Sequence, residues 1–221
     1  PNGEINIEDI ALKIKENTAL VSILYVNNEI GTISDVEAVS ALCRNNNIAF
    51  HSDLTQALGK MQIDIKKMGI DYASCSAHKI YGPKGIGAAF MKFDAYGIAP
   101  ITALMHGGEQ EFGFRAGTHA VHNIVGFGKA AEIALRDLKK NEVHIKRLDE
   151  MLLKGIATID NIHTTVDSSK RVPGIISLVV DKSDFHNERF IKKISNEVAL
   201  STGSACSAGE PSYVIQALGL G

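Results

Sequence analysis

The chain has 221 residues, of which 45% are hydrophobic and 22% charged, and its formal net charge is −2. This length allows one large domain or a domain and a half, and the composition excludes collagen-like, low-complexity and intrinsically disordered proteins. The near-neutral charge argues against direct nucleic-acid binding, which needs a concentrated basic face. The apolar runs fall short of the roughly 20 residues that cross a bilayer, so we expect no membrane span.

Hydrophobic periodicity predicts alternating helices and strands along the first half of the chain. Asn6 is predicted to cap a short helix, and residues 19–26 form an apolar, β-branched run typical of a strand buried on both faces. Ser34 and Glu37 have capping-box spacing at the start of a helix that the asparagines at 45–47 end. Further strands are predicted at 48–52, 70–75 and 86–91.

The second half is predicted to continue with fewer strands and longer helices. The expected elements are helices at 121–138 and 143–156, a strand at 174–180, a helix at 188–194 and a strand at 198–201. Strands alternating with helices indicate an α/β fold with a mostly parallel sheet. We therefore predict that residues 1–135 belong to a large α/β domain and that residues 136–221 form a small α+β domain.

Polar side chains follow the predicted strands at their carboxyl ends, where open parallel sheets place their chemistry. They comprise two amides, an acid, a hydroxyl, an imidazole and an amine: Asn28, Gln56, Asp53, Ser76, His78 and Lys79. This set suits pyridoxal phosphate (PLP). The ring nitrogen of PLP needs an anionic partner, its phenolic oxygen and phosphate need hydrogen-bond donors, and its aldehyde captures an amine.

Each of these residues also has a structural interpretation. A lysine after a strand is usually a solvated surface residue, and a single histidine such as His78 is more often structural than catalytic. Asp53 and Gln56 have capping-box spacing, so they could serve only to begin a helix. Residues 82–87 match neither a dinucleotide-binding loop nor a Walker loop and are expected to form a turn.

The three cysteines form no CxxC pair, which fits a reducing compartment and gives no zinc-ligand spacing. Without a signal peptide in view, we expect a cytoplasmic protein. Cys43 on a helix face and Cys75 in a strand are expected to be core residues. Cys206 lies among small residues at 201–209, a composition typical of a mobile loop. It is either an incidental surface thiol or a nucleophile and sulfur carrier.

Three motifs carry a family resemblance: VNNEIG at 26–31, SAHKIYGPKG at 76–85 and SAC at 204–206. In this order, they resemble the NifS/IscS group of cysteine desulfurases in the class V aminotransferase-like family. The resemblance implies the PLP-dependent transferase fold type I. It also implies an enzyme that takes sulfur from L-cysteine, releases L-alanine and keeps the sulfur as a persulfide for iron–sulfur cluster assembly or tRNA thiolation.

The resemblance assigns catalytic roles to Lys79, His78 and Cys206. Lys79 would form the Schiff base with PLP and then move protons. Cys206 would attack the sulfur of the bound substrate, and it could also serve as a transient iron–sulfur ligand. No resident metal is implied.

The cofactor-binding positions implied by the resemblance are Lys79, Asp53, Gln56, Asn28, Ser76, Ala77, His78 and Thr118. Asp53 would pair with the ring nitrogen, and Gln56 would bind the phenolic oxygen. Asn28 would lie beside the cofactor oxygen and the substrate carboxylate, and the stretch from Ser76 to His78 would hold the phosphate. Thr118 would reach the phosphate of a neighbouring subunit, which implies a homodimer with shared active sites.

Members of this family have a phosphate cradle before the position of Pro1 and a carboxylate-binding arginine beyond the position of Gly221. We therefore expect a chain that is incomplete at both ends. The sulfur acceptor is expected to be a protein, either an iron–sulfur scaffold or a tRNA thiolation enzyme. Two alternatives stay open: a selenocysteine lyase or other PLP lyase of the same fold, and a catalytically silent, truncated scaffold chain.

Overall fold

The computed structural model describes residues 3–98, 100–202 and 212–220, which fall into two compact units. The sheet unit contains residues 6–25 and 35–139. The C-terminal unit contains the described residues of 1–5, 26–34 and 140–221. The division into domains at residue 135 remains a prediction.

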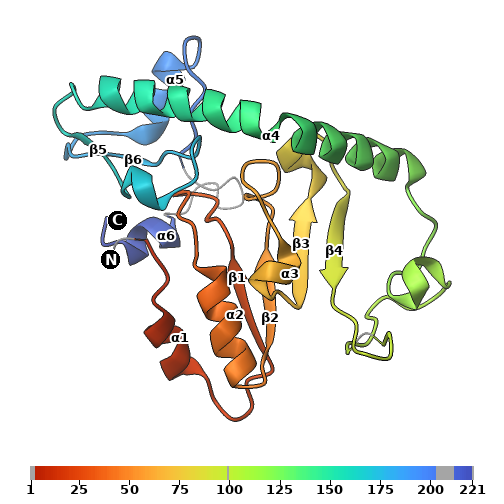
Figure 1. Cartoon of the computed structure of the whole chain (residues 1–221). Helices are drawn as coiled ribbons and strands as arrows, with labels where there is room; N and C mark the ends of the chain where they lie inside the picture. The colour runs from red at the N-terminus through yellow and green to blue at the C-terminus, as the bar shows by residue number, and fades with distance from the viewer. Residues whose placement is uncertain (1–2, 99, 203–211, 221) are drawn as a thin grey trace. The chain divides into compact units, whose positions relative to one another are not determined.

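The sheet unit is built on four strands in the order β1-β2-β3-β4 (Figure 1). Strands β1 (Leu20–Leu24), β2 (Ala49–Asp53) and β3 (Tyr72–Ser76) are parallel, and β4 (Gly87–Met91) runs antiparallel to β3. The predicted α/β class and mostly parallel sheet are confirmed. Because consecutive parallel strands are also neighbours, the residues that follow β2 and β3 emerge at the same edge of the sheet.

The helices of the sheet unit begin with α1 (Ile7–Lys13) and α2 (Val36–Asn45). Helix α2 packs on β2 and buries Val36, Val39 and Cys43, the face that the periodicity predicts. The predicted capping box at Ser34 is wrong by one residue, because the side chain of Asp35 accepts the hydrogen bond from the N–H of Ala38.

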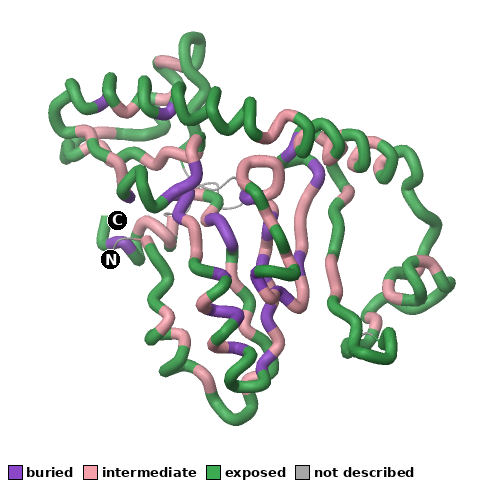
Figure 2. The backbone as a smooth tube through the Cα atoms, viewed as in Figure 1, coloured by how far each residue is buried: buried purple, intermediate pink, exposed green. Residues whose placement is uncertain are grey.

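Buried residues of the sheet unit are frequent in α2, in β2 and in the residues directly after β2 (Figure 2). Phe50 and Ser52 are fully buried on the face of the sheet covered by α2. The prediction that the first strand is buried on both faces is wrong, since Leu20 is 50% and Leu24 36% exposed. In the described sheet β1 pairs only with β2, and an apolar run does not specify which neighbours cover it.

Two short helical segments precede β4, and one long helix follows it. Helix α3 (Ile65–Met68) leads into β3, and the 3-10 helix η1 (Ala77–Ile80) follows β3 directly. After the 3-10 turn η2 (Gln110–Gly113), helix α4 (Val121–Ile156) runs for 36 residues. The prediction of two helices here is wrong, because residues 139–142 contain neither glycine nor proline to interrupt the backbone hydrogen bonds.

The C-terminal unit contains a two-stranded sheet and short helices. Strand β5 (Ile162–Thr164) pairs antiparallel with β6 (Leu178–Val180), and η3 (Ser168–Lys170), α5 (Asn187–Ile194) and α6 (Tyr213–Ala217) complete the unit. Ile30, Val166 and Leu218 form its buried apolar cluster. The predicted strand at 198–201 is wrong, since these residues are irregular, and β5 was not predicted.

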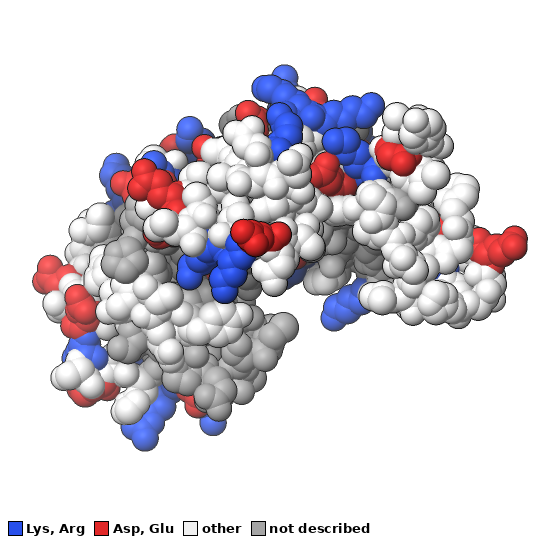
Figure 3. Space-filling view, turned by 90° about the horizontal axis from the view of Figure 1, so that it is seen from below, with Lys and Arg blue, Asp and Glu red and all other residues white. Residues whose placement is uncertain are grey.

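On the face shown in Figure 3, Lys and Arg side chains are interspersed with Asp and Glu, in keeping with the near-neutral formal charge. Within the described ranges, no helix combines the length and apolar character needed to cross a membrane.

Candidate active site

Asp53 and Lys79 lie at the same edge of the sheet. Asp53 is the last residue of β2, and Lys79 lies in η1, which starts directly after β3. Asp53 of β2 pairs with Ser74 of β3, so Asp53 and Ser74 lie beside each other in the parallel sheet. The topology therefore brings these two strand ends together, and the predicted roles of their polar residues stay predictions.

The carboxylate of Asp53 is held by its own chain. One carboxylate oxygen accepts a hydrogen bond from the N–H of Thr55 at 2.8 Å, and the backbone carbonyl of Asp53 accepts the N–H of Tyr25 at 2.9 Å. No α-helix begins here in the described chain, because residues 55–60 form turns. Asp53 is thus not the first residue of a capping box, and its second carboxylate oxygen is left out of that turn.

Gln56 is directed by a lysine that the sequence motifs do not single out. The ammonium group of Lys60 donates a hydrogen bond of 2.5 Å to the side-chain oxygen of Gln56, which is only 9% exposed. Burial, and then the positive charge of Lys79, lower the pKa of Lys60 to about 8. A third polar side chain therefore joins Gln56 and Lys79 in this part of the sheet unit.

The stretch Ser76 to Ile80 exposes its basic residues, leaves Ser76 half-buried and buries its apolar residues. Ala77 and Ile80 are buried, whereas His78 and Lys79 are exposed. The side chain of Ser76 does not cap η1, and the N–H of Ala77 donates to the carbonyl of Ile86 at 3.1 Å. Two exposed basic side chains and a hydroxyl thus stand together at the end of β3.

A hydrogen-bonded row that the sequence did not predict lies across the same sheet. The imidazole Nδ1 of His51 lies 2.8 Å from the hydroxyl of Ser22, and its Nε2 lies 3.1 Å from the hydroxyl of Ser74. By the alternation of a strand, His51 and Asp53 point to the same face of β2. The row ties the first three strands together next to the candidate site.

Two predicted cofactor-binding residues lie apart from this group. Asn28 is exposed and belongs to the C-terminal unit, so it is not placed relative to Lys79. Thr118 is exposed in the loop before α4, where the N–H of Gly117 donates to the side-chain oxygen of Gln110 at 3.0 Å. Their predicted roles stay predictions.

The cysteines differ in burial. Cys43 is buried, as predicted, and burial raises the pKa of its thiol. Cys75 is half-buried, and burial likewise raises the pKa of its thiol. Cys206 lies outside the described residues. The following residue that is described, Ser212, donates a hydrogen bond of 2.6 Å to Glu29, which links the VNNEIG motif to the start of α6.

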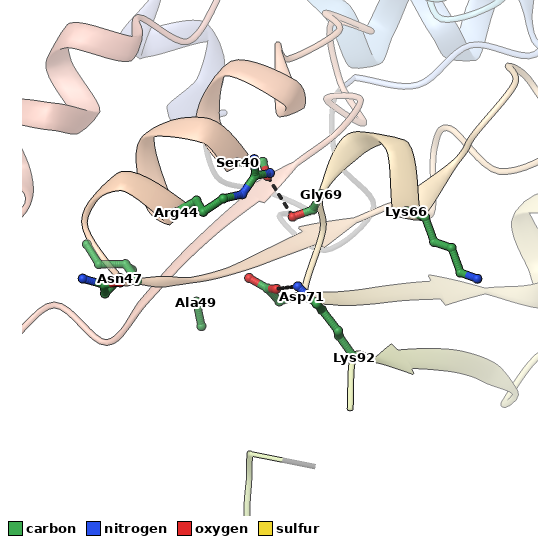
Figure 4. Close-up of a pocket in the computed structure, with 9 residues that line it drawn as sticks. Ser40, Arg44, Asn47, Ala49, Lys66, Gly69, Asp71 and Lys92 are labelled. Carbon is green, nitrogen blue, oxygen red and sulfur yellow. Dashed lines mark hydrogen bonds and ion pairs between the residues drawn. The ribbon is translucent and has the colours of Figure 1, made fainter. Parts of the chain in front are cut away.

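A cavity of about 480 Å³ lies at the other edge of the sheet (Figure 4). Ala49 and Asp71, at the amino ends of β2 and β3, line it together with Arg44, Lys66 and Lys92. Lys92 is paired with Asp71 at 3.2 Å. This cavity is opposite the strand ends that carry Asp53 and Ser76 and is separate from the candidate site.

Among the residues that the structure describes, no cluster of three or more His, Cys, Asp or Glu side chains could hold a metal ion. The donors at the strand ends suit an organic, anionic cofactor. A fixed carboxylate, a directed amide, a hydroxyl, an imidazole and an exposed amine match the ring nitrogen, phenolic oxygen, phosphate and aldehyde of PLP. The residues present therefore fit this cofactor.

The fold and the donor set define a PLP-enzyme domain of the class V type. The family model of class-V aminotransferases matches residues 1–220, and the chain belongs to this family. Within it, the chain is 43% identical over 222 residues to the cysteine desulfurase IscS of Ruthia magnifica, and the match covers 100% of the chain and 54% of that relative. The predicted resemblance to the NifS/IscS group is confirmed.

Solved structures give the same result. A NifS-like protein superimposes with a TM-score of 0.87 at 32% identity, over 100% of this chain and 57% of its own. The protein SspA, solved in complex with cysteine, matches with a TM-score of 0.77 at 32% identity, over 100% of this chain and 60% of its own. The predicted type I fold is confirmed, and the chain spans about half the length of the curated relatives that it matches.

Proposed function

We propose that the full-length protein containing this chain is a PLP-dependent cysteine desulfurase. The observation that carries the proposal is the placement of Asp53 at the end of β2 and of Lys79 just after the neighbouring parallel strand β3, in a chain similar to IscS along its whole length. The SspA structure was solved with cysteine bound, which supports cysteine as the substrate here. The products are L-alanine and a persulfide on the enzyme.

Each residue of the candidate site has a role in this proposal. PLP, when bound, acts as an electron sink that weakens the bond between carbon and sulfur in the substrate. Lys79 would supply the amine that holds the aldehyde carbon and would afterwards carry protons. Asp53 would face the ring nitrogen, where its negative charge would keep a proton on that atom. Gln56 would donate to the phenolic oxygen, and Ser76 and His78 would hold the phosphate.

Cys206 is the proposed sulfur carrier. Its thiol takes the sulfur atom of cysteine, so that one cysteine and one enzyme thiol become one alanine and one enzyme persulfide. The atoms balance without an added oxidant or reductant. A protein acceptor, an iron–sulfur scaffold or a tRNA thiolation enzyme, then removes the sulfur.

A homodimer is also part of the proposal. The segment between β4 and α4 exposes apolar side chains that a partner subunit would cover: Phe93, Tyr96, Ile98, Leu104, Met105 and Phe112. Leu104 and Phe112 are each 94% exposed, which is unusual for apolar residues in an ordered segment. Thr118 follows this segment, so contact with a second subunit would place Thr118 close to that subunit's site.

Replacing Cys206 by alanine tests the function directly. We expect the variant to bind PLP but to form no persulfide, because the sulfur carrier is missing. The measurement is alanine release, together with mass spectrometry of the protein after incubation with L-cysteine. Cys43→Ala is the control and should form persulfide. Full sulfur transfer by Cys206→Ala, or preferential turnover of selenocysteine by the unaltered protein, would contradict the proposal.

A second prediction concerns Asp53. The Asp53→Asn variant keeps the hydrogen bond from Thr55 but loses the negative charge, so alanine formation should fall by roughly 10²–10³-fold. Steady-state kinetics would measure this loss. Asp64→Asn is the matched control, because asparagine caps helix α3 as well as aspartate does. An Asp53→Asn variant with normal turnover would remove Asp53 from the site.

A further inference from the structure

Lys60 lies at the end of the turns that follow β2. The N–H of Lys60 donates to the carbonyl of Ala57 at 3.0 Å, and the N–H of Leu58 donates to the carbonyl of Leu54 at 2.8 Å. Gln56 and Lys60 are four residues apart, so these turns bring their side chains together. The ammonium group of Lys60 then donates to the side-chain oxygen of Gln56.

This contact fixes which end of the Gln56 amide is available. An amide has an oxygen that accepts and an NH₂ group that donates, and an ammonium group can only donate. With the oxygen of Gln56 engaged by Lys60, the NH₂ group is the end left for a ligand. Nine-tenths of the surface of Gln56 is buried, so its amide group is held in this one orientation. The side chain is therefore a donor, suited to an anionic oxygen.

A glycine brings Lys60 close to Lys79. Gly59 has a φ of +72°, and a Cβ atom there would lie 2.7 Å from Ile80 and 3.2 Å from Ala134 of α4. The absent side chain lets the turns after β2 pack directly against the residue that follows Lys79. The ammonium groups of Lys60 and Lys79 are thereby held close enough for the charge of one to act on the other. An anionic ligand would stabilise this pair of positive charges.

The lowered pKa of Lys60 agrees with this geometry. Burial is the larger cause and the charge of Lys79 the smaller one, and both act against the protonated form of Lys60. A bound anion would offset both effects.

We propose that Lys60 is a positioning residue that holds the oxygen of Gln56, so that the amide NH₂ group faces the phenolic oxygen of PLP. The positive charge of Lys60 also acts on the bond between the Lys79 amine and the aldehyde carbon of PLP. The inference rests on the proposed function, because it assumes that PLP binds at Lys79. Lys60 lies outside the motifs found in the sequence, and the proposal assigns a role to its contact with Gln56.

Lys60→Met in the full-length protein tests this proposal. Removing a hydrogen bond from a charged donor should weaken PLP binding by about tenfold or more, measured by titrating the cofactor-free protein with PLP. The visible absorption band of PLP bound to Lys79 changes with pH. Removing the positive charge of Lys60 should raise the pH midpoint of this change by about one pH unit, because that charge no longer disfavours the protonated form of the bond between Lys79 and PLP. A residue that only packed the fold would not shift this midpoint.

Three further variants sharpen the result. Lys60→Arg keeps a charged donor and should restore most of the affinity and the midpoint. Lys67→Met removes an exposed lysine of α3 and should change neither. In a Gln56→Leu background, Lys60→Met should weaken PLP binding much less than it does alone, because the contact is already lost.

The outcomes separate the two proposals. If the unaltered protein develops the visible band but Lys60→Met has the same affinity and the same midpoint, Lys60 is not a positioning residue and the proposed function stands. If the unaltered protein captures no PLP at all, the proposed function fails first. Additive effects of the Lys60 and Gln56 variants would likewise overturn the inference.

Discussion

The Lys79→Ala variant should lose the visible absorption band of the PLP adduct and should release no measurable alanine from cysteine. The amine that captures the aldehyde is gone, and the loss of proton transfer alone removes roughly 10²–10⁴-fold in rate. Borohydride reduction followed by peptide mass spectrometry would locate the adduct in the unaltered protein on the peptide that contains Lys79.

Lys84→Ala is the control for this experiment. Lys84 is exposed and lies five residues further along the same motif, so it is equally available to a free aldehyde. We expect the Lys84 variant to keep both the band and the activity. If reduction labels Lys84 or Lys60 and leaves Lys79 unmodified, the site has been assigned to the wrong lysine.

Replacing Asp149 by alanine should destabilise the C-terminal unit by about 3–5 kcal/mol, the usual effect of leaving one member of a buried ion pair alone. Arg171 binds both carboxylate oxygens of Asp149, at 2.9 and 2.6 Å, and the side chain of Arg171 is only 1% exposed. The N–H of Gly174 also donates to Asp149 at 2.8 Å. Without the carboxylate, a buried guanidinium and this N–H would both lack their partner.

Hydrogen exchange of the full-length protein would measure the loss locally. The amides of Gly174 and Val172 should exchange faster in Asp149→Ala, since Val172 donates to the carbonyl of Gly31 beside the same ion pair. Asp160→Ala, an exposed change in the same unit, should shift stability by no more than about 0.5 kcal/mol. Unchanged protection in Asp149→Ala would mean that the pair contributes little.

Burial by itself would raise the pKa of Asp149, but the hydrogen bonds from Arg171 and Gly174 outweigh it and lower the pKa. A carboxyl whose pKa is lowered by folding stabilises the folded state above its unfolded pKa and loses that contribution as the pH falls. The ion pair is thus intact at neutral pH, where the hydrogen-exchange comparison is made.

The sheet and the motif-bearing strand ends could be predicted from the sequence because both depend on local signals. The β-branched and apolar runs located the three parallel strands, and the position of Lys79 directly after β3 followed from the motif at 76–85. The positions of residues 53 and 79 at neighbouring strand ends could therefore be predicted from the sequence, and their roles in binding stay predictions.

The remaining features depend on contacts between distant residues, which no local pattern reports. Asp149 and Arg171 are 22 positions apart and match no motif. Lys60 resembles an ordinary surface lysine until its contact with Gln56 is seen. The exposure of Leu20 and Leu24 depends on which chain segments cover the sheet. Helix α4 is continuous because residues 139–142 contain no glycine or proline that would end a helix.

Helix α4 has a mechanical consequence. Its 36 residues extend for about 54 Å, and the change from the sheet unit to the C-terminal unit falls within it, between residues 139 and 140. Proteases and engineered insertions favour exposed, extended linkers, and there is none at that position. Cleaving the chain between residues 139 and 140 would therefore require unwinding a hydrogen-bonded helix.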